Sequence, residues 1–157
     1  MSTPEHAFQN LRDQVTRRVG ARLFTMLQWI PETGILRRVY TSHRTEYPVG
    51  LEKSVEISTA WLQVVIGERR TFLAATPDEL AEVFGDADLI ASLGCGAVIN
   101  APIIAEGDVV GVLAILDAAG SYDLSSVTEV DRIVDENGAD LARAFTALST
   151  SDPEEIQ

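Results

Sequence analysis

The hydrophobic and polar positions of the first forty residues predict a helix followed by a β-hairpin. Thr3 and Pro4 form a typical helix start, with an N-cap hydroxyl and a proline in the first turn. The apolar stripe of this helix consists of Phe8, Leu11 and Val15. Two runs of β-branched, aromatic and long side chains follow at 22–30 and 35–42, and the residues PETG separate them, which indicates a hairpin.

The middle of the chain changes to short helical segments. An irregular loop is expected at 43–55, where proline and glycine interrupt the pattern. Short helices are expected over 58–67, 76–84 and 86–94, with a brief strand over 71–74. The second of these helices begins with TPDE, which is a capping box with proline at the first helical position.

The last third of the chain predicts a second hairpin and one long helix. The strands at 97–104 and 109–116 are apolar at odd and even positions alike, so both faces of their sheet are expected to be covered. Ser126 and Glu129 form the expected capping box of a helix that runs to about residue 148.

This order of elements predicts the fold class. Helix, hairpin, short helices, hairpin and long helix give an α+β domain with a central antiparallel β-sheet. The terminal helices should cover one face, and the short helices and loops should cover a ligand pocket on the other. We expect a single domain over residues 1–150, followed by an acidic tail at 151–157.

Charge and composition exclude several classes of partner. The 157 residues include 12 basic and 24 acidic side chains, and the resulting net charge of −12 repels phosphate backbones, so no nucleic-acid partner is expected. Three arginine pairs, Arg17-Arg18, Arg37-Arg38 and Arg69-Arg70, are either local anion sites or solvated faces. No stretch is long and apolar enough for a membrane span, and the N-terminus does not resemble a signal peptide.

The cysteine and histidine content points to a reducing compartment and to no metal. One cysteine cannot form an internal disulfide, so we expect a cytoplasmic protein. Two histidines, 37 residues apart, and that cysteine do not give a usual metal-ligand spacing. No metal site is therefore expected.

The second hairpin carries a family resemblance. Its residues INAPIIAEGDVVGVLAILDAAG, at 99–120, resemble the signature of the GAF domain, and the order of elements extends this resemblance over about residues 5–148. The resemblance implies a GAF/PAS-like fold that binds an unknown small molecule. Because this fold hosts sensors, enzymes and dimerisation modules, the resemblance leaves the chemistry open.

The motifs of three GAF subclasses are missing from this chain. In the free methionine-(R)-sulfoxide reductases, further cysteines and a carboxylate cluster are implied, but the corresponding positions are Ala97, Ala114 and Leu116, so no reductase activity is expected. The bilin-binding domains commonly place a histidine after their cysteine, whereas glycine follows Cys95. The cyclic-nucleotide domains carry an Asn-Lys pair, whereas no asparagine precedes Lys53. The ligand and any cofactor therefore remain unknown.

Cys95 lies between two glycines in the sequence SLGCGAVINAPII. It follows the expected C-terminal end of a helix, where the negative end of the helix dipole disfavours a thiolate. Three roles stay open: a nucleophile, a thiol in a pocket wall, or a small packed residue at a corner.

The resemblance places a pocket between the sheet and the middle segment, residues 43–95. The candidate ligand-binding residues are Tyr40, Tyr47, Lys53, Trp61, Phe72, Ser92, Cys95 and Asn100. Trp61 is either core or pocket wall. The amide of Asn100 lies inside an apolar strand and must be hydrogen-bonded, either to the covering loop or to a ligand.

We expect a sensory module that passes its state to a partner protein. The alternatives are an enzyme related to the sulfoxide reductases and a ligand-free dimerisation module. The last helix carries a seam of apolar spacing at Val127, Val130, Val134, Asn137, Leu141, Ala144 and Leu148. This seam predicts a homodimer through the terminal helices, with Asn137 pairing with its symmetry mate or a bridging water. A monomer that buries the whole stripe is the alternative.

Overall fold

The two hairpins combine into one antiparallel sheet. In the computed structural model, which describes residues 3–45, 58–85 and 87–150, the strands are β1 (Leu23–Ile30), β2 (Ile35–Thr41), β3 (Phe72–Ala74), β4 (Ala97–Ala105) and β5 (Asp108–Asp117). Their order across the sheet is β2-β1-β5-β4-β3, and every neighbouring pair is antiparallel. The pairing of β1 with β5 joins the first hairpin to the second.

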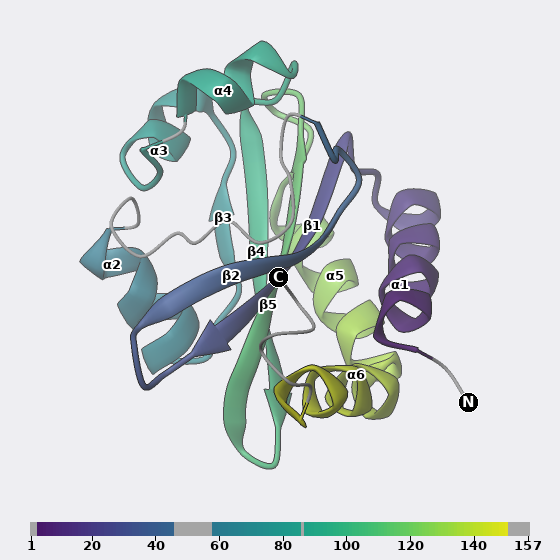
Figure 1. Ribbon diagram of the computed structural model, residues 1–157. Coiled ribbons are helices and arrows are strands. Elements are labelled where there is room, and N and C mark those ends of the chain that lie inside the picture. Colours follow the sequence, from purple (N-terminus) through teal and green to yellow (C-terminus); the bar gives the residue numbers. More distant parts are fainter. Residues whose placement is uncertain (1–2, 46–57, 86, 151–157) are drawn as a thin grey trace.

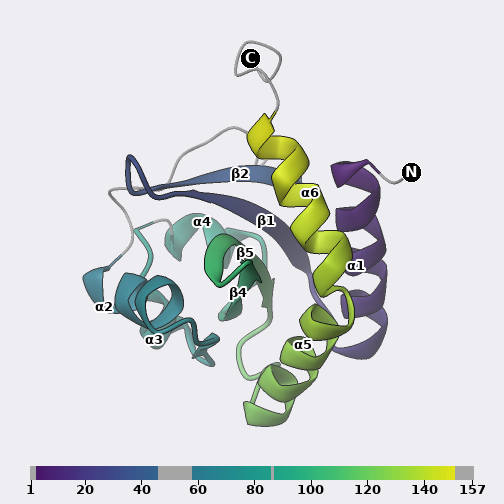
Figure 2. The same ribbon diagram turned by 90° about the horizontal axis from the view of Figure 1, so that it is seen from below.

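Helices cover both faces of this sheet (Figure 1). One face carries α1 (Pro4–Arg18), α5 (Leu124–Glu136) and α6 (Gly138–Thr150). The other face carries α2 (Thr59–Leu62), the π-helix η1 (Gln63–Gly67), α3 (Pro77–Ala81) and α4 (Ala87–Ser92). Figure 2 shows these two layers on opposite sides of the strands. The predicted α+β fold with differently covered faces is confirmed.

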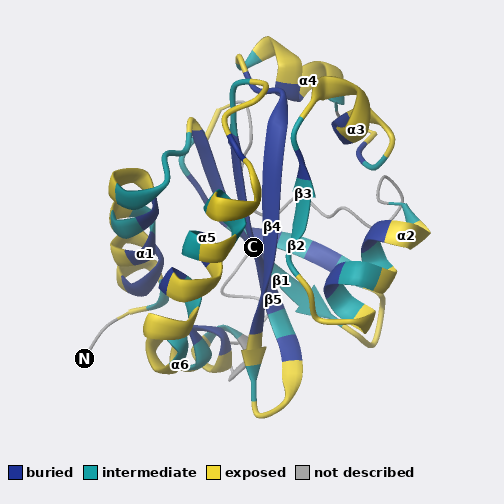
Figure 3. Ribbon diagram, turned by 180° about the vertical axis from the view of Figure 1, so that it is seen from behind, coloured by how far each residue is buried: buried dark blue, intermediate teal, exposed yellow. Residues whose placement is uncertain are grey.

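Both faces of the central strands are buried, as the continuous apolar runs predict. Along β4, Ala97, Ile99 and Ala101 pack toward α1, α5 and α6, whereas Val98 packs toward the short helices. Figure 3 shows the strands as a buried layer between helices whose outer surfaces are exposed. The sheet thus separates two apolar cores, one for each helical layer.

The prediction of one long C-terminal helix was wrong. The helix ends at Glu136, and a second helix begins at Gly138. Asn137 between them leaves the helical conformation, with φ −107° and ψ 12°. The expected capping box was also misplaced, because Asp123 is the N-cap and its reciprocal partner is Ser126.

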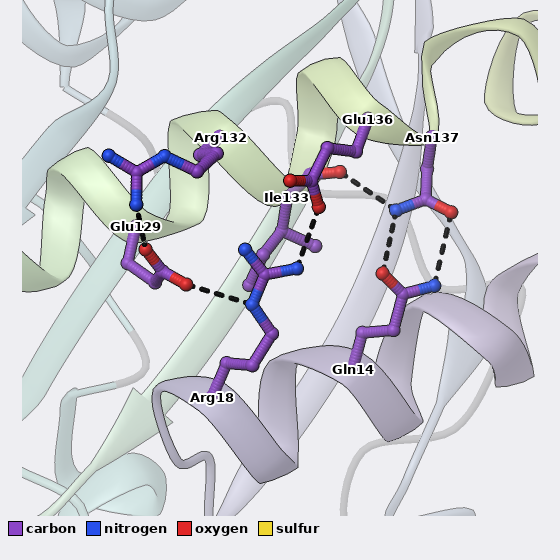
Figure 4. Close-up of polar contacts among 7 residues, drawn as sticks. All are labelled: Gln14, Arg18, Glu129, Arg132, Ile133, Glu136 and Asn137. Atoms are coloured by element: carbon purple, nitrogen blue, oxygen red, sulfur yellow. Dashed lines mark hydrogen bonds and ion pairs between the residues drawn. The ribbon is translucent and has the colours of Figure 1, made fainter.

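A polar cluster fixes α1 against the end of α5 (Figure 4). Arg18 binds Glu129 at 2.8 Å and Glu136 at 2.7 Å, which raises its pKa and lowers that of Glu136. The amides of Gln14 and Asn137 exchange two hydrogen bonds of 3.2 and 3.0 Å. Asn137 thus has a side-chain partner in its own chain, and its pairing across a dimer stays a prediction.

A β-bulge in β2 places Arg38 and Tyr40, which are two residues apart, on opposite faces of the sheet. Tyr40 pairs with Met26 and Arg38 pairs with Leu27, so Val39 is the additional residue. Because side chains alternate along a strand, one additional residue reverses the faces beyond it. Arg38 consequently faces the short helices, and Tyr40 faces α1.

Candidate functional site

A small cavity lies between the sheet and the short helices. Its lining comes from all strands except β3 and from the helical cover: Thr25, Leu27, Leu36, Arg38, Trp61, Phe84, Ile90, Val98, Asn100, Ala114 and Leu116. The volume is about 20 Å³. This space holds about one water molecule. The cavity is thus an apolar enclosure with a few polar groups on its sheet side, which is the general composition of a ligand pocket.

Trp61 and Asn100 form the polar centre of this cavity. Trp61 is 1% exposed, and its indole Nε1–H donates to Oδ1 of Asn100 at 3.0 Å. Ser58 positions the tryptophan, because its hydroxyl caps α2 by accepting from the Trp61 backbone N–H. Phe84 packs edge-on against the indole, with ring centroids 6.2 Å apart. The tryptophan is therefore fixed both by a hydrogen bond and by packing.

Arg38 brings a cation into the same cavity. Arg38 is buried, with 2% of its surface exposed. Its Nε atom is buried without a hydrogen bond, while the residue has other interactions. A buried guanidinium needs compensating acceptors, because taking a charge out of water costs on the order of several kcal/mol. Arg38 is therefore a buried positive charge on the cavity wall that has interactions of its own.

The structure brings together only part of the predicted site. Trp61 and Asn100 line one cavity, and Asn100 has a side-chain partner instead of the expected loop backbone. Phe72 lies opposite Asn100 on β3 and packs against the same core without lining the cavity. Tyr47 and Lys53 lie outside the described residues.

Two predicted site residues are in other places, and both expectations were wrong. Tyr40 lies in the core below α1, where its hydroxyl donates to Gln9 at 2.6 Å and accepts from Arg12 at 3.3 Å. The bulge in β2 is the physical reason, since a regular strand would have placed Tyr40 on the face of Arg38. Ser92 is exposed at the end of α4 and donates to the carbonyl of Leu89.

Arg38 and Thr25 are the polar cavity residues that the sequence prediction did not include. The sequence offers the Arg37-Arg38 pair as a possible anion site. Alternation of side chains along β2 was the signal that could have shown which of the two arginines faces the core. Thr25 is 1% exposed on β1, two residues from Leu27 on the same face. A buried polar residue at an inward position was the available signal.

Cys95 occupies the corner between α4 and β4. Gly94 before it has φ +83° and ends the helix, and the Cys95 backbone N–H donates to the carbonyl of Ile90. The thiol is buried beside the cavity without lining it. Burial raises the pKa of this thiol, against the lowering effect of Arg22. Of the three roles, this placement fits the packed corner residue.

Slow alkylation of Cys95 is the expected chemical consequence. A raised pKa keeps the thiol neutral to higher pH than a free cysteine, and the thiolate is the reactive form. Iodoacetamide at pH 8 should modify the native protein at least about tenfold more slowly than the urea-unfolded protein. Mass spectrometry over time measures both rates, and equal rates would contradict the burial of the thiol.

The Trp61–Asn100 bond should show energetic coupling. Asn100→Ala leaves a buried N–H without an acceptor, which costs about 1–3 kcal/mol of the free energy of unfolding. Trp61→Phe removes the donor. The double variant should lose about 1 kcal/mol less free energy of unfolding than the two single variants lose in sum. Urea unfolding of the four proteins measures this difference. Simple additivity would show that the bond contributes nothing.

The described residues contain no group of three or more His, Cys, Asp or Glu side chains arranged to hold a metal ion. Among the helices of the described chain, none has the length and apolarity to cross a membrane.

Comparisons with solved structures identify the fold. The GAF domain of a two-component sensor histidine kinase from Bacillus halodurans aligns with a TM-score of 0.70 and 18% identity, over 91% of this chain and 93% of that one. A GAF domain/HD domain protein from Geobacter sulfurreducens gives 0.72 and 10%, over 90% and 94%. The chromophore-binding domain of the bacteriophytochrome RpBphP3 from R. palustris gives 0.66 and 9%, over 96% and 58%.

Sequence comparison gives the family. A search among curated proteins finds no match for the chain. The family model of the GAF domain matches residues 3–134, from the cap of α1 into α5. Since this match covers all five strands and well over half of the chain, the chain belongs to the GAF domain family.

Proposed function

We propose that this GAF domain is a sensory module that binds a small molecule in the cavity of Arg38, Trp61 and Asn100. The observation that carries the proposal is the composition of the cavity, where polar groups converge inside apolar walls. Similar structures support it, since one is the GAF domain of a sensor histidine kinase and another is a chromophore-binding domain. Within the cell we place the module in the cytoplasm, with its one cysteine reduced.

A ligand larger than water requires the helical cover to move. The cavity has a volume of about 20 Å³, which a single water molecule fills. The cover includes the π-helix η1 directly after Trp61, and π-helical turns occur frequently at functional sites. Arg69, just beyond it, adopts φ +59°, which non-glycine residues rarely do. This cover is the part of the fold whose rearrangement would admit the ligand.

Strand β2 offers a connection from the cavity to the terminal helices. Arg38 faces the cavity, and Tyr40 beyond the bulge binds Gln9 and Arg12 of α1. The cluster of Figure 4 then joins α1 to α5. A displacement of Arg38 by ligand would therefore act on the surface that α1 and α5 offer to a partner protein.

Thermal stabilisation by small molecules tests the binding function. A ligand present at 100 times its dissociation constant stabilises the folded state by about 2.7 kcal/mol. We expect at least one class of compound in a metabolite library to raise the melting temperature of the wild type and of Ser92→Ala, but not of Asn100→Leu. Ser92 is the matched control because it is exposed and outside the cavity. Stabilisation of all three proteins alike, or of none, would contradict the proposal.

The alternative function is a module that only associates. The small volume of the cavity favours this alternative. The apolar seam of the last helices speaks against it, because Val130, Leu141 and Ala144 of the seam pack inside the chain. A homodimer through the terminal helices stays a prediction, for which sedimentation at micromolar concentration is the measurement. Absence of methionine sulfoxide reductase activity is likewise a prediction, which a thioredoxin-coupled assay tests.

A further inference from the structure

We propose that a basic amphipathic helix of a partner protein docks in the groove between α5 and residues 69–71. Strand β4 contributes Pro102 and Ile104 to this groove. Among the described residues, its lining shares no member with that of the cavity of Trp61 and Asn100. The inference therefore goes beyond the function proposed above, because it names a separate surface and the chemistry of a partner.

Helix α5 carries a second apolar stripe beside the one that packs on the sheet. Val130 and Ile133 are buried in the core, whereas Val127 and Val134 line the groove and are only partly buried. Leu124 lies about one turn before Val127 on the same face of the helix, and 77% of it is exposed. Positions 124, 127, 131 and 134 have the a/d spacing against which a neighbouring helix packs.

The edge of β4 in this groove is unsuited to an added strand. Within the described residues β3 pairs with β4 only at 98–100, so no strand accompanies 101–105 on that side. Pro102 lacks a backbone N–H, and the ladder is irregular between Ile103 and Ile104. Proline and bulges protect sheet edges from further strands. Ile104, which is 43% exposed, offers an apolar side chain instead, so the groove fits a helix that lies along α5.

The carboxylates of the groove determine the charge of the partner. Asp131 and Asp135 lie about one turn apart on α5, and both are exposed. The Thr71 hydroxyl donates to Asp131 at 2.5 Å, but this neutral donor leaves the negative charge uncompensated. No basic side chain of the described residues forms an ion pair with either aspartate. A lysine or arginine of the partner would supply the missing positive charge.

A second copy of this chain is the less suitable occupant of the groove. A two-fold contact brings the same surface of both copies together, so the two aspartates would face their equivalents, and like charges oppose association. The arginines on the opposite wall are already engaged, since Arg70 binds Glu68 at 2.5 Å and Arg69 lies 4.0 Å from Asp108. A partner with basic residues of its own avoids this conflict.

Fluorescence anisotropy with synthetic helices tests the proposal. The probe is a labelled peptide of about two heptads, with leucine at positions a and d and lysine at e and g. One control peptide has the same residues in shuffled order, because a net charge of −12 attracts any basic peptide. A second control has glutamate in place of lysine. We expect the wild type to bind the probe at least about tenfold more tightly than either control.

A matched pair of double variants tests the charges. Asp131→Asn with Asp135→Asn should weaken binding of the probe at least about tenfold. Glu82→Gln with Asp88→Asn removes the same charge from the short helices on the other face of the sheet, so affinity should change less than about twofold. All four side chains are exposed, so both double variants should fold.

A matched pair of leucine variants tests the apolar stripe. Leu124→Ser should weaken binding of the probe about tenfold, since the probe buries this side chain. Leu89 is the control, because it is an exposed leucine of α4 outside the groove. Leu89→Ser should leave the affinity within about twofold of the wild type.

The outcomes distinguish the occupants of the groove. Binding of the shuffled peptide as tight as that of the probe, or equal losses within either matched pair, would overturn the docking site. If the probe does not bind, the proposal fails, and the melting-temperature measurement above decides the ligand-binding function separately. Self-association that Leu124→Ser abolishes in sedimentation would place a second copy in the groove and overturn the partner helix.

Discussion

Gly111→Ala should lower the free energy of unfolding by about 3 kcal/mol or more, or prevent folding. Gly111 lies on β5, where β1 and α6 approach it from two sides. A β-carbon at this position would lie 2.5 Å from Cε1 of Phe145 and 2.7 Å from the carbonyl oxygen of Leu27. The ring is fully buried and the carbonyl belongs to the neighbouring strand, so neither can move away easily. Urea unfolding followed by circular dichroism measures the loss.

Gly138→Ala is the matched control for this variant. Gly138 is the first residue of α6, and beyond its chain neighbours and its own helix backbone no atom lies within 4 Å of an added β-carbon. Because alanine favours the helix, stability should stay the same or rise by up to about 1 kcal/mol. Equal stability of the two alanine variants would show that the close approach of α6 to the sheet is wrong.

Phe8→Ala should destabilise the fold by about 3–5 kcal/mol. Phe8 is 1% exposed and joins α1 to the sheet and to α6. Its ring lies 6.1 Å from that of Tyr40 and 5.4 Å from that of Phe145. Removing it leaves a hole at the point where three elements meet.

Phe72→Ala provides the comparison for Phe8. Phe72 lies on the edge strand β3 and is only partly buried, so the same change of side chain should cost roughly 1–2 kcal/mol. Chemical unfolding of both variants measures the difference. A Phe72→Ala loss as large as that of Phe8→Ala would contradict the account of the helical layer.

The strand pattern was sufficient to predict the sheet and its two covers. β4 and β5 are apolar at consecutive positions, and a strand buried on both faces has no other simple explanation. The break at Asn137 was not predictable in this way, because the apolar seam continues across it. The residue that holds Asn137 is Gln14, which lies 123 positions earlier in the chain.

The site was only partly predictable, and the reasons are local. An asparagine inside an apolar strand needs a hydrogen-bond partner, which made Asn100 recognisable from the sequence. Trp61 was ambiguous between a core residue and a pocket wall, and its hydrogen bond to Asn100 makes it both. The position of Tyr40 depended on one additional residue in β2, which the amino-acid pattern does not reveal.

The indole signals of the ¹⁵N-labelled protein give the most direct test of the cavity as a ligand site. The chain has two tryptophans, and Trp61 lines the cavity whereas Trp29 does not. On titration with a compound that raises the melting temperature of the wild type, the Nε1–H signal of Trp61 should shift with saturation while that of Trp29 stays in place, and Asn100→Leu should abolish the shift of the remaining signals around the cavity. An unchanged Trp61 signal at a concentration where calorimetry detects binding, or a shift confined to Trp29, would contradict a ligand site in this cavity.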